Sequence, residues 1–382
     1  MKKTNCIFVF WYPFLSYHQI DMLYSFNKKV KSNIKINVFM ENNEGRLHQG
    51  WKFPNFFSVK PKLISGFFWP LYTIHQAYTH RNDVHILGSP FESIKTLFLF
   101  IVLGLLKADT SLLAERYSQF SVGYLSDKFS FFNIIKSKLR PVIYKFYGLL
   151  IRRFHFKVFA ISRLAVLQYL SVGVSKNLIY QFGYYVNSYP FGVQKLKSEY
   201  KKNKLIVRDK KILSLVFLGS LIKTKNLDLL ITAVKQLNLD GIAIRLDIYG
   251  AGDAYQYDFD NKKISYKGLI NFGYSHEVLM NYDALILPSL YDGWGVVVNE
   301  AILANLPVIV SSNCGSKDLV QQLKCGYIFR SGSLSDLMSK IRLIKNRKKL
   351  QELRRNIGKF KDRISPAKAA EFLHLSIIND RT

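Results

Sequence analysis

Short apolar runs alternate with helical patterns along most of the chain, and this alternation constrains the fold more than any other feature. In the first half, runs typical of buried strands cover residues 5–11, 34–40, 84–87, 111–115 and 158–162. Helical spacing of apolar residues follows several of these runs, notably over 91–106 and 163–170. A repeated strand–helix order predicts a parallel sheet with helices on both faces.

A second series of the same kind begins after residue 211. Strand patterns cover residues 212–219, 243–249, 284–287 and 307–310, with helical patterns between them. Because 382 residues exceed the usual size of one domain, we predict two Rossmann-like, doubly wound α/β domains. The strand ends of two such domains would face a central cleft that holds a ligand.

A change in composition indicates the domain boundaries. Residues 194–211 are highly charged and poor in large apolar side chains, which is typical of a linker or exposed loop. We predict an N-terminal domain over 1–190, a linker over 191–211 and a C-terminal domain over 212–365. The last helical pattern, within 366–382, is expected to cross back to the N-terminal domain.

The net charge of +29 is spread over both halves of the chain and implies an anionic partner. Nucleic acid, an anionic membrane surface and a phosphorylated small molecule all satisfy this condition. The three cysteines have neither disulfide nor zinc-site spacing, which suits a reducing compartment. Zinc fingers, helix-turn-helix patterns and RNP-like motifs are not recognisable, so nucleic acid is the weakest of the three partners.

Two segments bear on the membrane alternative. The apolar run 97–106 is too short to span a bilayer, which takes about 20 residues. It is interpreted as a core helix, and the alternative is that one of its faces contacts lipid. Residues 116–155 mix aromatic with basic residues, and 142–153 have the pattern of an amphipathic helix with a basic side. That side is either a solvated helix face or a contact with anionic lipid headgroups.

The most informative segment is residues 288–315, which read PSLYDGWGVVVNEAILANLPVIVSSNCG. A strand ends at Pro288, and a glycine-containing loop then opens a helix. Glycines permit close backbone approach, and the N–H groups at a helix start attract phosphate oxygens. Asp292 and Glu300 are eight residues apart, about two helical turns, so both carboxylates can face one cleft. Ionised carboxylates accept hydrogen bonds from sugar and ribose hydroxyls.

This segment resembles the E-x7-E donor-site signature of retaining glycosyltransferases of family 4, which have the two-domain GT-B fold. Asp292 stands where the family usually has Glu, and Glu300 matches the second acid. The resemblance implies that Asp292 orients the donor sugar and Glu300 binds the nucleotide ribose. The loop residues expected to border the donor are Gly293, Trp294, Gly295 and Val296.

Three further segments fit the same resemblance over residues 205–330. In GSLIKTKN, residues 219–226, Gly219 follows a strand and Lys225 falls on the family lysine that binds the donor pyrophosphate. Ser220 replaces the family arginine, and Lys223 is a candidate to compensate. Gly250 begins a glycine-rich turn near the donor. Leu269 is expected near the nucleobase.

The N-terminal half offers two candidate catalytic residues. His18 lies in the first strand–helix turn, where a lone histidine is also a common structural residue. Glu115 follows a predicted strand and is either an acceptor-side group of the cleft or a surface ion-pair partner. The acids Asp258 and Asp260 mimic a D-x-D metal motif in a polar stretch. We assign no metal and no cofactor, because GT-B enzymes stabilise the leaving phosphate with protein cations and helix dipoles.

The sequence therefore predicts a retaining, metal-independent glycosyltransferase with a nucleotide diphosphate sugar, UDP-sugar favoured, as co-substrate. The expected acceptor is a lipid-linked or envelope saccharide in bacterial surface polysaccharide synthesis, such as O-antigen, capsule or lipopolysaccharide. The expected location is the cytoplasm, peripheral on the inner face of the cell membrane. The alternatives are a non-catalytic envelope-associated protein with a degenerate donor site and, more remotely, a basic nucleic-acid-binding protein.

Overall fold

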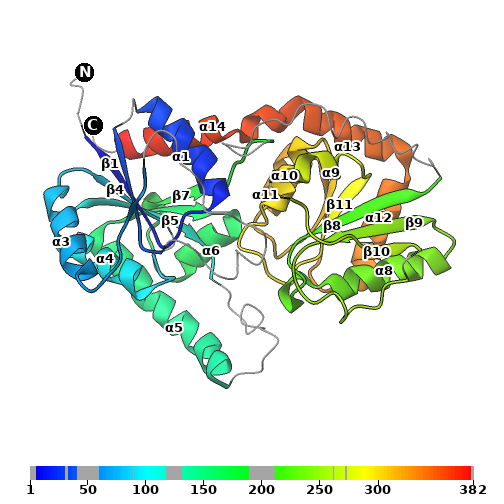
Figure 1. The fold of residues 1–382 in the computed structure, drawn as a ribbon, viewed down its shortest axis with the longest axis horizontal. Coiled ribbons are helices and arrows are strands. Elements are labelled where there is room, and N and C mark those ends of the chain that lie inside the picture. The colour runs from blue at the N-terminus through cyan, green and yellow to red at the C-terminus, as the bar shows by residue number, and fades with distance from the viewer. Residues whose placement is uncertain are drawn as a thin grey trace.

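The computed structural model has two α/β lobes, side by side in Figure 1. It describes residues 6–30, 33–40, 60–88, 90–117, 131–188, 211–260, 262–271 and 273–379. Apart from residue 211, the predicted linker lies outside these ranges. Among the helices in the described ranges, none has the length and apolar content needed to cross a bilayer.

The N-terminal lobe holds a seven-stranded sheet with the order β3-β2-β1-β4-β5-β6-β7. Neighbouring strands pair in parallel. The strands are β1 (Phe8–Tyr12), β2 (Ile34–Val38), β3 (Lys62–Leu63), β4 (Val84–Gly88), β5 (Asp109–Glu115), β6 (Lys157–Ile161) and β7 (Ile179–Phe182). The helices are α1 (Tyr17–Lys29), α3 (Trp69–Thr79), α4 (Ile94–Leu105), α5 (Phe131–Phe154) and α6 (Arg163–Ser171). β3, β7 and α3 were not predicted from the sequence, and α5 begins well before the predicted amphipathic segment.

Alternate residues of the central strand β1 point to opposite faces of this sheet, as strand geometry requires. Val9 and Trp11 belong to a core shared with α3, α4, α5 and α6. Phe8 and Phe10 belong to a second core shared with α1 and with the C-terminal helix α14 (Pro366–Ile378). Both faces are therefore covered by helices, which explains why the strand runs are apolar throughout.

The C-terminal lobe repeats this design with a six-stranded sheet in the order β10-β9-β8-β11-β12-β13. Its strands are β8 (Leu213–Leu218), β9 (Ile244–Tyr249), β10 (Ile264–Tyr266), β11 (Ala284–Leu287), β12 (Val308–Ser311) and β13 (Gly326–Phe329). The remaining helices are α8 (Leu227–Leu239), α9 (Ser275–Leu279), α10 (Val297–Leu303), α11 (Lys317–Leu323), α12 (Leu334–Lys345) and α13 (Arg347–Phe360). One face of the sheet packs on α8, α12 and α13, and the other on α10 and α11.

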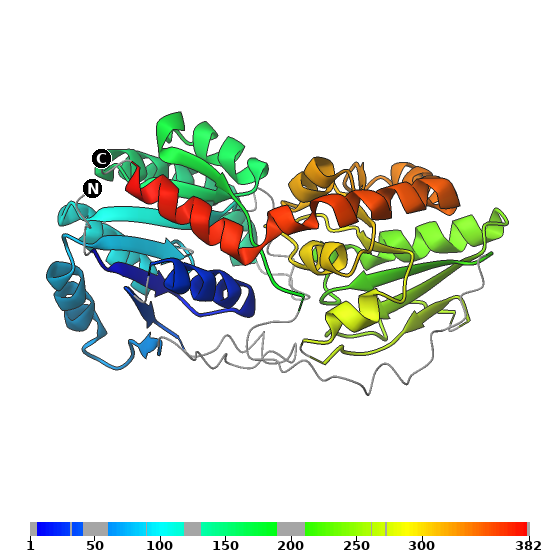
Figure 2. The same cartoon turned by 90° about the horizontal axis from the view of Figure 1, so that it is seen from above.

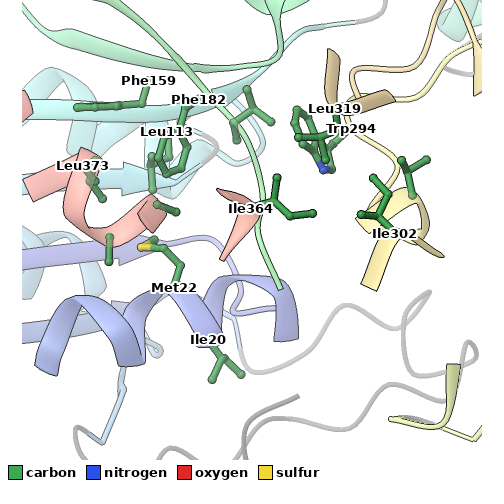
Figure 3. Packing of buried hydrophobic residues seen from close by; sticks show 14 of the residues in the cluster. Ile20, Met22, Leu113, Phe159, Phe182, Trp294, Ile302, Leu319, Ile364 and Leu373 are labelled. Carbon is green, nitrogen blue, oxygen red and sulfur yellow. The ribbon is translucent and has the colours of Figure 1, made fainter. Parts of the chain in front are cut away.

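One apolar core continues from lobe to lobe (Figure 3). Trp294, from the loop before α10, packs against Gly183, where a Cβ would lie 2.5 Å from its ring. Helix α14 leaves the C-terminal lobe and lies along α1 (Figure 2). Its Phe372 ring stacks on Phe182 at 6.2 Å, and its Ile377 carbonyl accepts a hydrogen bond from Lys157. The two sheets are thereby held with their strand ends toward each other.

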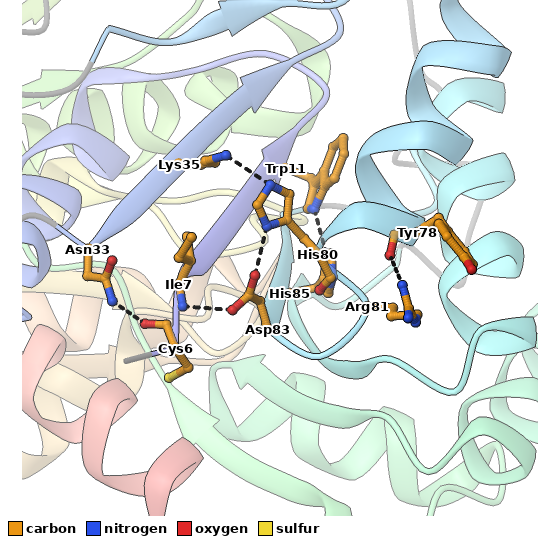
Figure 4. A network of polar contacts seen from close by, with 10 residues as sticks. All are labelled: Cys6, Ile7, Trp11, Asn33, Lys35, Tyr78, His80, Arg81, Asp83 and His85. Atoms are coloured by element: carbon orange, nitrogen blue, oxygen red, sulfur yellow. Dashed lines mark hydrogen bonds and ion pairs between the residues drawn. The ribbon is translucent and has the colours of Figure 1, made fainter. Parts of the chain in front are cut away.

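A polar network joins residues near the starts of β1, β2 and β4 in the N-terminal sheet (Figure 4). Lys35 Nζ donates to His80 Nε2 at 2.9 Å, and His80 Nδ1 lies 2.7 Å from an Asp83 oxygen. Trp11 Nε1 donates to His85 Nδ1 at 3.0 Å. Burial lowers the pKa of His85 to about 4, so this imidazole stays neutral and serves the fold.

Candidate active site

A cleft of about 430 Å³ lies between the lobes, at the carboxyl ends of strands from both sheets. The C-terminal lobe contributes the segments after β8, β9, β10 and β11 and the start of α10. The N-terminal lobe contributes the end of β5, the start of α1 and residues 184–188 after β7. Of the predicted site residues, the lining includes His18, Glu115, Gly219, Lys225, Gly250, Leu269, Asp292, Trp294, Gly295, Val296 and Glu300.

Two glycines border the cleft on the side of the C-terminal lobe. Gly250 has a φ of +152°, and a Cβ there would lie 1.8 Å from the carbonyl oxygen of Gly219. Gly295 has a φ of +89°, and a Cβ there would lie 2.9 Å from Leu287. Both φ values lie where glycine is favoured, and neither residue places a side chain in the cleft.

Lys225 and Asp292 form an ion pair in the cleft, with Nζ and Oδ2 2.6 Å apart. Burial alone would lower the pKa of Lys225, but the Asp292 carboxylate outweighs it and the pKa of Lys225 is raised. The ammonium is therefore fully charged near neutral pH. The Asp292 backbone is itself fixed, because its carbonyl accepts a hydrogen bond from the Gly315 N–H at 3.2 Å.

Glu300 lies in the first turns of α10 and lines the same cleft. Burial raises the pKa of its carboxyl to about 7, and a hydrogen bond with Ser275, the first residue of α9, lowers it in part. At neutral pH the side chain is thus poised between its charged and uncharged forms. Sequence reasoning missed Ser275, since nothing in its local pattern connects it to a residue further along the chain.

The N-terminal lobe brings Glu115 and His18 to the opposite wall. The Glu115 carboxylate packs on Gly293, where a Cβ would lie 1.8 Å from Oε2. Tyr184 hydrogen-bonds Glu115, and burial raises the pKa of Tyr184 far above its ordinary value, so its hydroxyl stays protonated and donates. The His18 ring lies 4.4 Å from the Tyr184 ring, and its Nε2 lies 3.0 Å from the Ser16 hydroxyl. Tyr184 follows the unpredicted strand β7, which is why it was missed.

Arg116, the residue after β5, ties the two lobes together beside the cleft. Its guanidinium donates to the carbonyl of Asn313 and lies 4.6 Å from the centre of the Tyr291 ring. The Tyr291 hydroxyl in turn donates to the Arg116 carbonyl. These contacts join β5 to the loop before α10 and to the loop after β12, so the cleft walls are braced against each other.

Two predicted residues, Lys223 and Gly293, lie outside the cleft lining. The Lys223 side chain is exposed, whereas Gly293 is buried against Glu115. The two acids of the D-x-D-like stretch have local partners. Asp258 pairs with Lys235, and Asp260 accepts hydrogen bonds from the backbone N–H groups of residues 262–264. Within the described ranges, no three His, Cys, Asp or Glu side chains gather as metal ligands. Metal independence remains a prediction.

Residues 197–362 match the family model for Glycosyl transferases group 1, and this region contains Lys225, Asp292 and Glu300. An uncharacterised glycosyltransferase of Methanocaldococcus jannaschii is 29% identical over 114 residues, which are 28% of this chain and 29% of that protein. A poly(ribitol-phosphate) alpha-N-acetylglucosaminyltransferase of Staphylococcus aureus is 24% identical over 131 residues, 32% of this chain and 26% of that protein. The matches thus span under a third of these curated relatives.

Solved structures match over nearly the whole chain. Anabaena HepE, crystallised with UDP and glucose, has a TM-score of 0.66 at 14% identity and covers 98% of this chain and 100% of its own. The lipopolysaccharide outer core galactosyltransferase WaaB has a TM-score of 0.65 at 14% identity, covering 98% and 99%. These likenesses confirm the predicted GT-B fold.

Proposed function

We propose that this chain is a retaining glycosyltransferase that moves a sugar from a nucleotide diphosphate sugar to an acceptor hydroxyl. The observation that carries the proposal is the single cleft in which Lys225, Asp292 and Glu300 of one lobe face Glu115 of the other. The match of residues 197–362 to Glycosyl transferases group 1 supports it, because it covers the first three of these residues.

The donor half of the cleft suits a nucleotide diphosphate sugar. The volume of about 430 Å³ lies within the range of small-molecule sites, about 300–1,000 Å³. We assign the diphosphate to Lys225 and to the backbone at Gly295, just before α10, since N–H groups and an ammonium both favour phosphate oxygens. The N–H groups of Gly219 and Gly250 already donate to the carbonyls of Tyr249 and Gly268. Glu300 then accepts hydrogen bonds from the ribose, and Leu269, half-exposed at the rim, lies beside the base.

The chemistry assigned to these residues is transition-state stabilisation by fixed charges. As the bond from sugar to phosphate breaks, negative charge grows on the leaving diphosphate, and Lys225 neutralises it. The acceptor hydroxyl attacks from the same face of the sugar and passes its proton to the departing phosphate, which retains the anomeric configuration. Asp292 orients the sugar, and Glu115, held by Tyr184, orients the acceptor. Closure of the lobes excludes water and limits hydrolysis.

The proposed acceptor is a lipid-linked or envelope saccharide of a bacterial surface polysaccharide, and UDP is the favoured nucleotide. The high positive charge supports an acceptor held at an anionic membrane. The names of similar proteins point the same way: one acts on poly(ribitol phosphate), one belongs to the lipopolysaccharide outer core, and one was crystallised with UDP.

A panel of nucleotide sugars tests the proposal. The true donor raises the thermal midpoint of the protein and is turned over when acceptor lipid extracts are added. Glu300→Ala abolishes the shift and the turnover, whereas Glu352→Ala, on the exposed face of α13, changes neither. Proton NMR of the product reports the anomeric configuration, and an inverted product would refute retention. Donor binding by the wild type without turnover would favour the non-catalytic alternative.

A further inference from the structure

The outward side of α5 carries a stripe of apolar side chains that the fold leaves uncovered. The helix has 24 residues and extends from the lower edge of the N-terminal lobe in Figure 1. Apolar residues recur at every turn along its outer face, and their side chains are between 38% and 65% exposed: Ile135, Leu139, Val142, Phe146 and Leu149. A surface helix of a globular protein normally turns such a stripe toward the core.

The opposite side of α5 packs against the core of the N-terminal lobe. Ile151 is fully buried, and the Tyr144 and Tyr147 rings contact Tyr117 and Phe91 at 3.6 and 4.0 Å. At Gly148, a Cβ would lie 2.2 Å from a backbone carbonyl in the turn after α6, so the helix is seated tightly there. The inner face is complete without the outer stripe, and the stripe is left for a partner outside the lobe.

Positive charge follows one flank of the stripe. Lys138, Lys145 and Arg152 lie along this flank at every second turn, and all three are exposed. Every charged residue between positions 131 and 154 is basic. A helix with an apolar stripe, a basic flank and no acid has the makeup of helices that lie in the plane of an anionic membrane surface.

We propose that the outer face of α5 docks on an anionic lipid bilayer, with the apolar stripe inserted among the headgroups and the basic flank paired with lipid phosphates. Charge decides against a second copy of the chain, because two such faces would oppose basic residues to basic residues. Nucleic acid does not account for the apolar stripe, because a phosphate backbone binds cations but does not cover apolar side chains such as half-exposed Val142 and Phe146.

Docking in this way brings the acceptor side of the cleft close to the membrane. Tyr117, which packs on Tyr144 of α5, is two residues beyond Glu115 on the same chain segment. A bilayer under α5 therefore lies next to the wall of the cleft that faces the acceptor. This consequence rests on the proposed function, since it gives a lipid-linked acceptor a short path to the donor. The docking surface itself does not depend on the proposed function.

Vesicle sedimentation of the full chain tests the charge requirement. The triple variant Lys138→Gln, Lys145→Gln, Arg152→Gln is compared with Lys348→Gln, Lys349→Gln, Arg355→Gln, an equal loss of exposed charge on α13. Each basic residue near an anionic surface contributes about fivefold to affinity, so the α5 variant loses on the order of 100-fold for vesicles of equal phosphatidylcholine and phosphatidylglycerol. The α13 variant binds nearly as well as the wild type. Equal losses in both variants would overturn the proposal.

A second pair of variants tests insertion of the stripe. Val142→Ser, Phe146→Ser lowers binding to the same vesicles by about tenfold or more, because it removes the largest inserted groups. Leu239→Ser, at the exposed end of α8 where the leucine is 87% accessible, leaves binding unchanged. Unchanged vesicle binding by the α5 serine variant would refute docking through the stripe. So would a wild-type dimer that this variant dissolves, or wild-type protein that binds duplex DNA but no vesicles.

Donor binding separates this proposal from the proposed function. The α5 variants keep the thermal shift caused by the nucleotide sugar, since α5 contributes nothing to the cleft lining. Glu300→Ala loses that shift and still sediments with anionic vesicles. A wild-type protein that shows the thermal shift with the nucleotide sugar but binds no anionic vesicles would refute the docking proposal and leave the proposed function standing.

Discussion

The raised pKa of Glu300 predicts that both the stability of the protein and its affinity for the donor depend on pH. Burial raises its pKa from an ordinary 4.5 to about 7, so the unliganded fold holds the proton more tightly than the unfolded chain does. For an acid with a raised pKa, ionisation costs stability. The penalty is absent below pH 4.5, grows as the pH rises and is complete above about pH 7.

The magnitude follows from the same pKa. Each tenfold change in proton affinity is worth about 1.4 kcal/mol, so a rise from 4.5 to about 7 corresponds to up to about 3 kcal/mol. Glu300→Gln keeps the shape and removes the charge. We expect the variant to match the wild type at pH 4.5 and to exceed its free energy of unfolding by up to about 3 kcal/mol at pH 8. Urea unfolding followed by circular dichroism measures the difference, and exposed Glu352→Gln is the control.

Donor binding has the opposite requirement. On the proposed assignment, ribose hydroxyls donate to the ionised carboxylate of Glu300. Donor binding then favours the ionised form, which burial disfavours, and it releases a proton. Between pH 6 and pH 8 the ionised fraction rises from about a tenth to about nine tenths, so affinity for the nucleotide sugar improves about tenfold. Calorimetry in buffers of different ionisation enthalpy measures both the affinity and the proton release.

The Glu300→Gln variant tests whether Glu300 is the group whose ionisation controls donor affinity. Its affinity for the nucleotide sugar is weaker than that of the wild type and independent of pH over the same interval. A wild-type affinity that does not change between pH 6 and pH 8 would refute the assignment of Glu300 to the ribose. So would a pH dependence that persists in Glu300→Gln, because the titrating group would then be another residue.

Three further outcomes are expected. Lys225→Met lowers turnover by on the order of 100-fold in a steady-state assay, while Lys223→Met, exposed and outside the cleft, leaves it within about twofold. Gly250→Ala forces a Cβ onto the carbonyl of Gly219, so it destabilises the C-terminal lobe by about 2 kcal/mol or more in urea unfolding and removes the thermal shift caused by the nucleotide sugar. Trp294→Ala empties a fully packed site at the lobe junction and costs about 3–5 kcal/mol of stability, measured in the same way.

Residue pattern alone determined the two-sheet architecture. Strands such as β1 and β11 are buried on both faces, so their sequences are continuously apolar and stand out between helical patterns. Edge strands are weaker signals: β3 has two residues, both exposed, and β7 has one buried residue in four. These edges were missed because a strand with one neighbour needs less apolar surface.

The cleft residues of the C-terminal lobe could be predicted from the sequence, because each follows a strand or lies near the start of a helix and local spacing then fixes its position. Lys225, Asp292 and Glu300 all line the cleft for this reason. The contacts that the tertiary structure decided join residues far apart in the chain, such as Glu115 with Tyr184 and Glu300 with Ser275. They depend on how whole elements dock, which local spacing does not encode.

The outer face of α5 and the pKa of Glu300 likewise depend partly on the sequence and partly on the tertiary structure. The sequence of α5 showed an amphipathic, basic helix, but only packing decided that Tyr144 and Ile151 point inward and Phe146 outward. Glu300 was identified from its spacing to Asp292, but its raised pKa comes from burial in the folded protein, which the hydrogen bond with Ser275 offsets in part. Periodicity is a local property of the chain, whereas burial is a sum over everything the fold brings near a residue.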